Sequence, residues 1–208
     1  MLVVTVLRTM RMLSCDFSPR IVQAVKRMVD DWAPRGTDFL CVTDVPVPGV
    51  NTLPLLHKWP GWYAKLEMYD PRIVGDFLYI DLDMPIVGPL EPFLRPRTFT
   101  GMYDAKPGQF GSQLMYVPVS VRSGIWKDWI KDPWGHIQHY NQPGRRWDSG
   151  FAEKHVGLSA KHWETELPGL IQNRKDVLHC GLNSSTCIVN CTSRPRPWQM
   201  PQFRKLYQ

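Results

Sequence analysis

The sequence predicts one α/β domain with a mixed, mostly parallel central sheet and helices on both faces of that sheet. A length of 208 residues suits a single domain. An apolar fraction of 43% beside 21% charged residues supports a globular core. The first part of the chain, up to residue 43, has the order strand, helix, strand. Because strands joined by a helix usually lie parallel in one sheet, this order indicates the fold class.

Each of these first elements has a recognisable pattern. Residues 2–7 are apolar and mostly β-branched, as expected for a buried strand. A helix is expected over residues 16–32, where apolar side chains recur every three or four positions. Ser18 suits the N-cap of this helix and Pro19 its first position. Residues 39–43 form a second short apolar run, which predicts the second strand.

The rest of the chain predicts further strands and helices between loops. Residues 44–61 are expected to form a loop because they contain four prolines and two glycines. A polar segment rich in glycine and proline, residues 131–146, is expected to be a mobile loop. Helices are predicted at residues 62–69 and 121–130. Strands are predicted at residues 77–82, 98–103, 113–117, 177–180 and 186–191.

The charge of the chain favours an anionic partner. The net charge is +6 and the pI is about 9.1. Nucleic acid, phosphorylated lipid and nucleotides are therefore the classes of ligand to consider. No run of about 18 apolar residues exists, so no membrane span is expected. The N-terminal residues are interrupted by arginine, unlike a signal peptide, and a cytoplasmic location is expected, in the host if a phage encodes the chain.

The five cysteines predict reduced thiols rather than a disulfide framework, because they are odd in number and scattered. Cys180, Cys187 and Cys191, with His179, offer side chains that bind zinc. Their spacing matches no common structural zinc site, and cysteines in strands are usually core residues. Core packing is therefore the favoured interpretation, with zinc as its alternative.

The most informative motif is Asp81-Leu82-Asp83, which directly follows the apolar residues 77–80. Side chains at i and i+2 of a strand point to the same side, so the two carboxylates emerge together. Ligands of open α/β sheets bind at the C-terminal ends of the strands. Neighbouring carboxylates repel each other, and Mg²⁺ or Mn²⁺ would remove the conflict while sharing its shell with substrate phosphates. The alternative is a surface turn after the strand.

Two longer stretches surround this motif, WPGWYAKLEMYD at residues 59–70 and FLYIDLDMPIVGPL at residues 77–90. They resemble the family 8-like glycosyltransferases of the GT-A fold, which include many short bacterial and phage members. The resemblance extends in the same order through residues 3–8, 41–44, 110–118 and 194–198. It implies a metal-dependent transferase that uses a UDP-sugar donor and retains the configuration of the anomeric carbon.

The resemblance also implies the site residues. Asp81 and Asp83 would hold Mn²⁺ or Mg²⁺ against the donor diphosphate, and Asn190 would supply a third ligand. Donor binding is implied for residues spread along the chain: Leu7, Arg8, Asp44, Lys65, Leu82, Arg194 and Arg196. Catalytic roles are implied for Lys65, which would face the donor, and for Asp148, which would approach the sugar and the acceptor. The alternatives are a solvated helix charge at Lys65 and a helix N-cap at Asp148.

The chain departs from the family pattern at a few of these positions. Asn190 and Thr192 stand where the family supplies a metal-binding histidine. Ser149 stands where glutamine is usual, and Gly111 and Gln113 replace the more common asparagine and glycine. These departures suggest an alternative function, a nucleotide-sugar-binding protein with impaired catalysis.

The C-terminal segment, residues 192–208, is basic and contains no acidic residue. The resemblance predicts that it closes over the donor site. Its aromatic residues, interleaved among Arg and Lys, also suit a nucleic-acid-binding module, or a transferase that modifies a DNA base. The acceptor could accordingly be a saccharide, a protein or modified nucleic acid, and the chain could form a homodimer.

Overall fold

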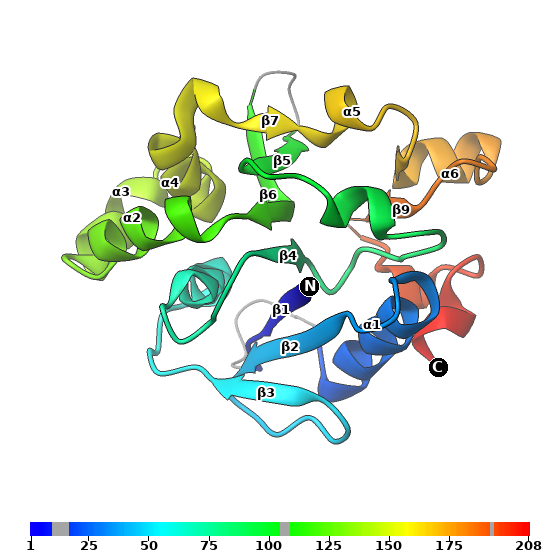
Figure 1. The fold of residues 1–208 in the computed structure, drawn as a ribbon, viewed down its shortest axis with the longest axis horizontal. Coiled ribbons are helices and arrows are strands. Elements are labelled where there is room, and N and C mark those ends of the chain that lie inside the picture. The colour runs from blue at the N-terminus through cyan, green and yellow to red at the C-terminus, as the bar shows by residue number, and fades with distance from the viewer. Residues whose placement is uncertain (10–16, 105–108, 192–193) are drawn as a thin grey trace.

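A seven-stranded sheet forms the centre of the molecule, with the strand order β3-β2-β1-β4-β6-β5-β7 (Figure 1). The computed structural model describes residues 1–9, 17–104, 109–191 and 194–208. Strands β3, β2, β1 and β4 are parallel, β6 runs antiparallel to β4 and β5, and β7 is parallel to β5. The strands are β1 (Leu2–Leu7), β2 (Asp38–Thr43), β3 (Asn51–Pro54), β4 (Phe77–Ile80), β5 (Thr100–Tyr103), β6 (Phe110–Val117) and β7 (Lys161–His162).

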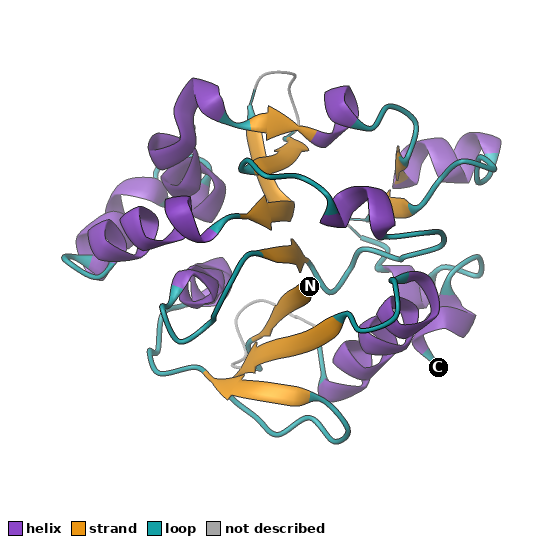
Figure 2. Ribbon diagram, viewed as in Figure 1, coloured by secondary structure: helices purple, strands orange, loops and turns teal. Residues whose placement is uncertain are grey.

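Helices cover both faces of this sheet (Figure 2). Helix α1 (Pro19–Trp32) packs on one face, where it buries an apolar stripe. The other face is covered by the 3₁₀ helix η1 (Gly61–Tyr69) and by α2 (Val119–Trp129), α3 (Pro133–Tyr140) and α4 (Trp147–Val156). Along β1, Val3 and Leu7 face α1 whereas Val4 and Val6 face the opposite core, as the alternation of side chains in a strand requires.

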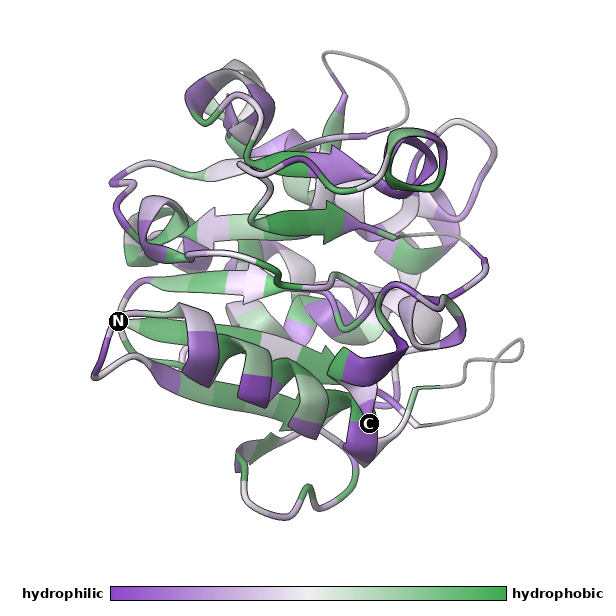
Figure 3. Cartoon of the chain, turned by 90° about the vertical axis from the view of Figure 1, so that its right-hand side faces the viewer, coloured by the Kyte–Doolittle hydropathy of each residue, from purple (hydrophilic) through white to green (hydrophobic). Residues whose placement is uncertain are grey.

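Hydropathy follows this arrangement in Figure 3, where the strands are largely hydrophobic and α1 alternates between hydrophobic and hydrophilic residues around its turns. A two-stranded sheet, β8 (Ile171–Asn173) with β9 (Ile188–Asn190), lies beside the main sheet. The remaining helices are short: η2 (Glu91–Leu94), η3 (Gly157–Ser159), α5 (Trp163–Glu166), α6 (Arg174–Cys180), η4 (Pro197–Gln199) and η5 (Arg204–Tyr207). Within the described residues, no helix combines the length and apolarity that crossing a bilayer demands.

The predicted fold class is confirmed, with small shifts at element boundaries. Helix α1 begins after Ser18, whose carbonyl oxygen accepts the Ile21 amide, and Asp16 lies outside the described residues. The strand predicted at residues 77–82 ends at Ile80, so the acidic motif follows it rather than closing it. The predicted helix at residues 62–69 is present as the 3₁₀ helix η1, and β6 begins three residues earlier than predicted, at Phe110.

Three predictions of local structure are wrong. The loop of residues 44–61 contains β3, an edge strand that tolerates its terminal Pro54. The loop of residues 131–146 contains α3, whose start has a cap: Asp132 accepts the Gly135 amide at 2.9 Å and Pro133 follows. The strand of residues 177–180 is the end of helix α6, because a short apolar run does not distinguish a strand from a helix.

Helices α2 and α4 are joined through Asp128, a carboxylate with two partners on α4. It accepts from Lys154 Nζ at 2.8 Å and from His155 Nε2 at 3.1 Å. The hydrogen bond and charge of Lys154, with the charge of His155, lower the pKa of Asp128 to about 2. This pairing stabilises the fold above the ordinary carboxyl pKa of 3.8 and is lost as the pH falls toward 2.

We therefore expect Asp128→Asn to lower the free energy of unfolding by up to about 1 kcal/mol at pH 7, as for a partly exposed ion pair. Urea unfolding of both proteins at several pH values measures the effect. The difference between wild type and variant should shrink as the pH falls from 5 to 3 (roughly the lower part of the carboxyl range). A difference that stays constant over this range would contradict the assignment.

Candidate active site

Polar residues gather at one edge of the sheet because three parallel strands end there. Arg8 follows β1, Asp44 follows β2 and Asp81 follows β4. Strand β6 is antiparallel and brings its first residues to the same edge, where the Asp81 amide donates to the Gln113 carbonyl at 2.9 Å. The predicted position of the acidic motif, at the C-terminal edge of the parallel strands, is therefore where the fold puts it.

Lys65 of η1 joins three elements at this edge. Its Nζ lies 3.2 Å from Asp81 Oδ2 and 3.2 Å from Asp148 Oδ2 of α4, and it donates to Ser112 Oγ of β6 at 3.1 Å. Ser112 Oγ in turn donates to Asp148 Oδ2 at 2.6 Å. The Lys65 side chain is only 11% exposed, so it is not the solvated helix charge of the alternative interpretation.

Asp83 faces a different cation, Arg196, which comes from the C-terminal segment. The guanidinium forms an ion pair with Asp83 Oδ2, and its Cζ lies 5.0 Å from the centroid of the Phe17 ring. The same segment contacts the motif again where Tyr207 donates its hydroxyl to the Leu82 carbonyl at 3.2 Å. Residues more than a hundred positions apart thus meet at the acidic motif.

We call Lys65, Asp81, Asp83, Asp148 and Arg196 the charge cluster. Three carboxylates and two cations give it a formal charge of −1 (−3 and +2). Burial and the neighbouring Asp81 raise the pKa of Asp83 to about 7, against the opposing charge of Arg196. Burial also raises the pKa of Asp81, whereas Lys65 keeps its proton because Asp148 and Asp81 outweigh the effect of burial and raise its pKa. The cluster is therefore short of positive charge.

Arg8 and Asp44 lie together beside this cluster. Asp44 accepts the Thr9 amide at 3.0 Å and the Thr9 hydroxyl at 3.1 Å, and its Oδ2 lies 3.6 Å from Arg8 Nε. Arg8 also donates to the His57 carbonyl at 2.9 Å. Leu7, the last residue of β1, is fully buried.

Three further positions that the sequence analysis named belong to the end of β9 and to the C-terminal segment: Asn190, Thr192 and Arg194. Asn190 ends β9, where its amide nitrogen donates to Asn173 Oδ1 at 3.4 Å. Arg194 precedes a cis proline, and Thr192 lies outside the described residues. Asp148 is not an N-cap, because α4 begins one residue before it, at Trp147.

A ready-made cluster of metal ligands is absent from the part of the chain that the structure describes. Residues 1–9, 17–104, 109–191 and 194–208 contain no group of three or more His, Cys, Asp and Glu residues that could hold a metal ion. The zinc interpretation gains no support, because His179, Cys180, Cys187 and Cys191 do not form such a group. Cys187 and Cys191 are buried, as expected for core residues, whereas Cys180 is exposed. Asp81 and Asp83 offer two hard oxygen ligands with a deficit of positive charge, which suits a divalent cation completed by phosphate and water.

Sequence reasoning missed two residues that contact the cluster. Tyr79 donates its hydroxyl to Asp81 Oδ1 at 2.5 Å, and the signal was available because Tyr79 lies two residues before Asp81 and so on the same side of the strand. Ser112 reaches the cluster through the antiparallel pairing of β6 with β4, which no local pattern reveals.

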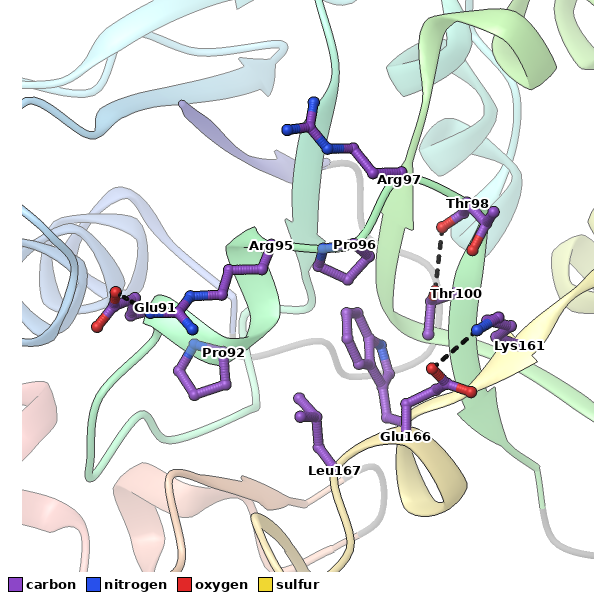
Figure 4. Close-up of a pocket in the computed structure, with 11 residues that line it drawn as sticks. Glu91, Pro92, Arg95, Pro96, Arg97, Thr98, Thr100, Lys161, Glu166 and Leu167 are labelled. Atoms are coloured by element: carbon purple, nitrogen blue, oxygen red, sulfur yellow. Dashed lines mark hydrogen bonds and ion pairs between the residues drawn. The ribbon is translucent and has the colours of Figure 1, made fainter.

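A hollow of about 500 Å³ lies away from this edge, between η2, the start of β5, β7 and α5 (Figure 4). Its rim includes the ion pairs of Arg95 with Glu91 and of Lys161 with Glu166. Strand β5 runs in the same direction as β4, so Thr100 at its start lies at the opposite edge of the sheet from Asp81. None of the predicted site residues lines this hollow.

Comparison with known proteins relates the fold to glycosyltransferases. No protein-family model matches the chain, and no curated protein matches its sequence. An active-site mutant of LgtC superposes with a TM-score of 0.70 at 11% identity, covering 99% of this chain and 95% of LgtC. Galactosyltransferase LgtC in complex with donor and acceptor sugar analogues gives a TM-score of 0.68 at 10% identity, over 100% and 95% of the two chains.

The glycosyltransferase GlyE of Streptococcus pneumoniae is also similar, with a TM-score of 0.68 at 13% identity. The match covers 99% of this chain but 59% of the solved GlyE chain. These identities are low, so the likeness establishes the architecture rather than the activity. The resemblance found in the sequence is thereby confirmed at the level of the fold, and the chain has the GT-A fold of these glycosyltransferases.

Proposed function

We propose that this protein is a metal-dependent glycosyltransferase that transfers a sugar from a UDP-sugar donor. The observation that carries the proposal is the charge cluster, which lies at the ligand-binding edge of a GT-A sheet with a formal charge of −1. A diphosphate adds negative charge, so a bound cation would favour its binding to the cluster. Burying two neighbouring carboxylates costs free energy unless positive charge compensates them.

Asp81 and Asp83 are the residues that would hold Mn²⁺ or Mg²⁺, with Asn190 as a third ligand implied by the resemblance alone. Bound there, the ion supplies positive charge to the diphosphate as it leaves the sugar. Tyr79 orients Asp81 through its hydrogen bond at 2.5 Å. The hydrogen bond of Asn190 to Asn173 would have to give way or be shared for Asn190 to contribute its oxygen.

Lys65 and Arg196 supply the positive charges of the site. Each is paired with a carboxylate of the motif, so each is already oriented toward the place where the diphosphate would sit. On donor binding Lys65 and Arg196 would donate to phosphate oxygens instead, which would leave Asp81 and Asp83 free to hold the cation. Arg8, Asp44, Leu7, Leu82 and Arg194 complete the proposed donor site at the ends of the neighbouring strands and in the C-terminal segment.

The C-terminal segment, residues 192–208, is proposed to close over the donor. Support comes from its packing: Arg196 reaches Asp83, and Tyr207 binds the Leu82 carbonyl. The ring of Trp198 bridges these two points, 5.4 Å from Phe17 and 5.5 Å from Tyr207 between centroids. The segment's role is therefore tied to the acidic motif itself. Asp148, hydrogen-bonded by Ser112, would face the sugar and the acceptor.

The proposal predicts that UDP and Mn²⁺ together raise the melting temperature more than either alone. Nucleotide sugars with different bases and sugars, each tested with Mn²⁺ and with EDTA, identify the donor through release of the corresponding nucleoside diphosphate. NMR of the product shows whether the anomeric configuration is retained. No stabilisation by any nucleotide with Mn²⁺ would overturn the proposal, whereas stabilisation with no turnover across acceptors would favour a nucleotide-sugar-binding protein.

A further inference from the structure

Two tryptophans form an exposed stack that the proposed donor chemistry does not use. Trp62 of η1 is 54% exposed and Trp147 of α4 is 51% exposed. Their ring centroids lie 5.8 Å apart with an angle of 23° between the planes. We call them the tryptophan pair. Large exposed aromatic groups side by side are uncommon on a protein surface and usually mark a binding site.

The tryptophan pair borders the charge cluster on the side of Lys65 and Asp148. Trp62 lies three residues before Lys65, and side chains at i and i+3 of a 3₁₀ helix project from the same face. Trp147 directly precedes Asp148, whose Oδ2 lies 3.2 Å from Lys65 Nζ. The pair therefore lies on η1 and α4, the two elements that supply Lys65 and Asp148, whereas Asp83 and Arg196 come from other parts of the chain.

The backbone holds Trp147 in an unusual conformation. Arg146 and Trp147 have φ angles of 60° and 49°, in the left-handed region that bulky residues rarely adopt. Such strain persists only where the surroundings enforce it, and it concentrates at functional sites.

Two contacts enforce this conformation. Arg146 donates to the Phe110 carbonyl at 3.1 Å and forms an ion pair with Glu153. A Cβ at Gly150 would lie 1.9 Å from the Arg145 carbonyl oxygen, so only glycine lets this turn approach the helix so closely. The exposed position of Trp147 is thus built into the fold.

We propose that the tryptophan pair is the acceptor platform, and that the acceptor is a saccharide whose pyranose ring stacks on the exposed indole faces. The inference rests on the proposed transferase function. A pyranose presents an apolar face of C–H groups and a rim of hydroxyls. Flat indole rings suit the apolar face, and the polar groups of Lys65, Asp148 and Ser149 on the same two elements suit the hydroxyls.

Stacked aromatic side chains also bind single-stranded nucleic acid, but there they line a positively charged groove. The basic C-terminal segment does not provide that groove here. Phe203 and Tyr207 anchor it in the core on the α1 face, whereas the helices that carry the tryptophan pair cover the opposite face. Arg146, the cation next to Trp147, is neutralised by Glu153, which leaves Arg145 as the exposed arginine of this turn. The structure therefore favours a neutral saccharide over nucleic acid.

Saturation-transfer NMR tests the inference on the full chain with UDP and Mg²⁺ present, because Mg²⁺ is diamagnetic and leaves the ligand signals sharp. The probes are lactose, cellobiose, maltotriose and chitotriose, with a single-stranded oligonucleotide as the rival ligand. Wild type should bind at least one saccharide through the C–H face of its ring. Trp62→Ala and Trp147→Ala should each weaken that binding about tenfold, while Trp147→Phe should keep most of it.

The control variant is Trp134→Ala, because Trp134 of α3 is 61% exposed yet outside the pair. It should bind the saccharide like wild type, and all variants should keep wild-type stabilisation by UDP and Mn²⁺. With UDP binding intact, three results would overturn the inference. They are no saccharide binding to wild type, saccharide binding that both alanine variants keep unchanged, and oligonucleotide binding that depends on the pair. If wild type itself does not bind UDP, the proposed function is overturned instead.

Discussion

Asp83→Asn is expected to lower the metal-dependent transfer rate by about a hundredfold or more. Asparagine keeps the shape of the side chain but removes the negative charge that would hold the cation, and with it the charge that stabilises the leaving diphosphate. The side chain of Asp83 is only 6% exposed, so solvent does little to compensate for the lost charge. UDP release as a function of Mn²⁺ concentration measures the effect, and the apparent affinity for Mn²⁺ should fall with the rate.

The metal-free variant should nevertheless be at least as stable as wild type. Burial and Asp81 already oppose the negative charge of Asp83, as the raised pKa of about 7 indicates, and a neutral amide relieves this repulsion. A gain in stability with a loss of function is the common result when a strained site is neutralised. Thermal melting in EDTA checks this part of the prediction, and a large loss of stability would contradict it.

Asp76→Asn is the matched control, because Asp76 lies just before β4 and Asp83 lies just after it. Asp76 accepts from Tyr116 and from the Val119 amide at the opposite edge of the sheet. An asparagine oxygen can accept one of these bonds, and no metal role is proposed there. The control should keep the Mn²⁺ dependence of wild type. Equal loss of Mn²⁺ dependence in both variants would assign the effect to a general disturbance of β4.

The architecture was predictable because its signals are local. The strand, helix, strand start depends on apolar runs and on the Ser18-Pro19 cap, and both are properties of neighbouring residues. The wrong predictions are those where local signals conflict. Glycines and prolines around α3 concealed the Asp132 cap, and the short run at the end of α6 is as apolar as a strand. Strand β3 exists because β2 offers it a partner, which its own sequence does not reveal.

The candidate site divides in the same way. Asp81 and Asp83 could be found from a strand followed by two carboxylates, whereas Lys65 and Asp148 were reached only through the resemblance, since 83 positions separate them. Ser112 reaches Lys65 and Asp148 because β6 pairs with β4. The two tryptophans meet because η1 packs on α4. Long-range contacts of this kind need the fold, so a sequence pattern finds them only when a family supplies the fold in advance.

Lys65→Met is expected to destabilise the metal-free protein by about 3–5 kcal/mol, because removing one partner of a buried ion pair leaves uncompensated charge. Here two carboxylates, Asp81 and Asp148, lose the cation that lies 3.2 Å from each of them. The cluster changes from −1 to −2 in formal charge. Urea unfolding in EDTA measures the loss, and Lys65→Arg should lose less because it keeps the charge.

Lys154→Met provides the scale for this effect. The Lys154 side chain is 52% exposed and pairs with Asp128 on the surface, so its loss should lower the free energy of unfolding by less than about 1 kcal/mol.

Mn²⁺ distinguishes the two lysines further. If the cation binds at Asp81 and Asp83, it supplies positive charge next to the carboxylates that Lys65 has left, and it should stabilise Lys65→Met more than wild type. Mn²⁺ should leave the effect of Lys154→Met unchanged, since Asp128 joins α2 to α4 and no metal role is proposed for it. An equal response of both variants to Mn²⁺ would mean that the metal does not share the charge cluster with Lys65.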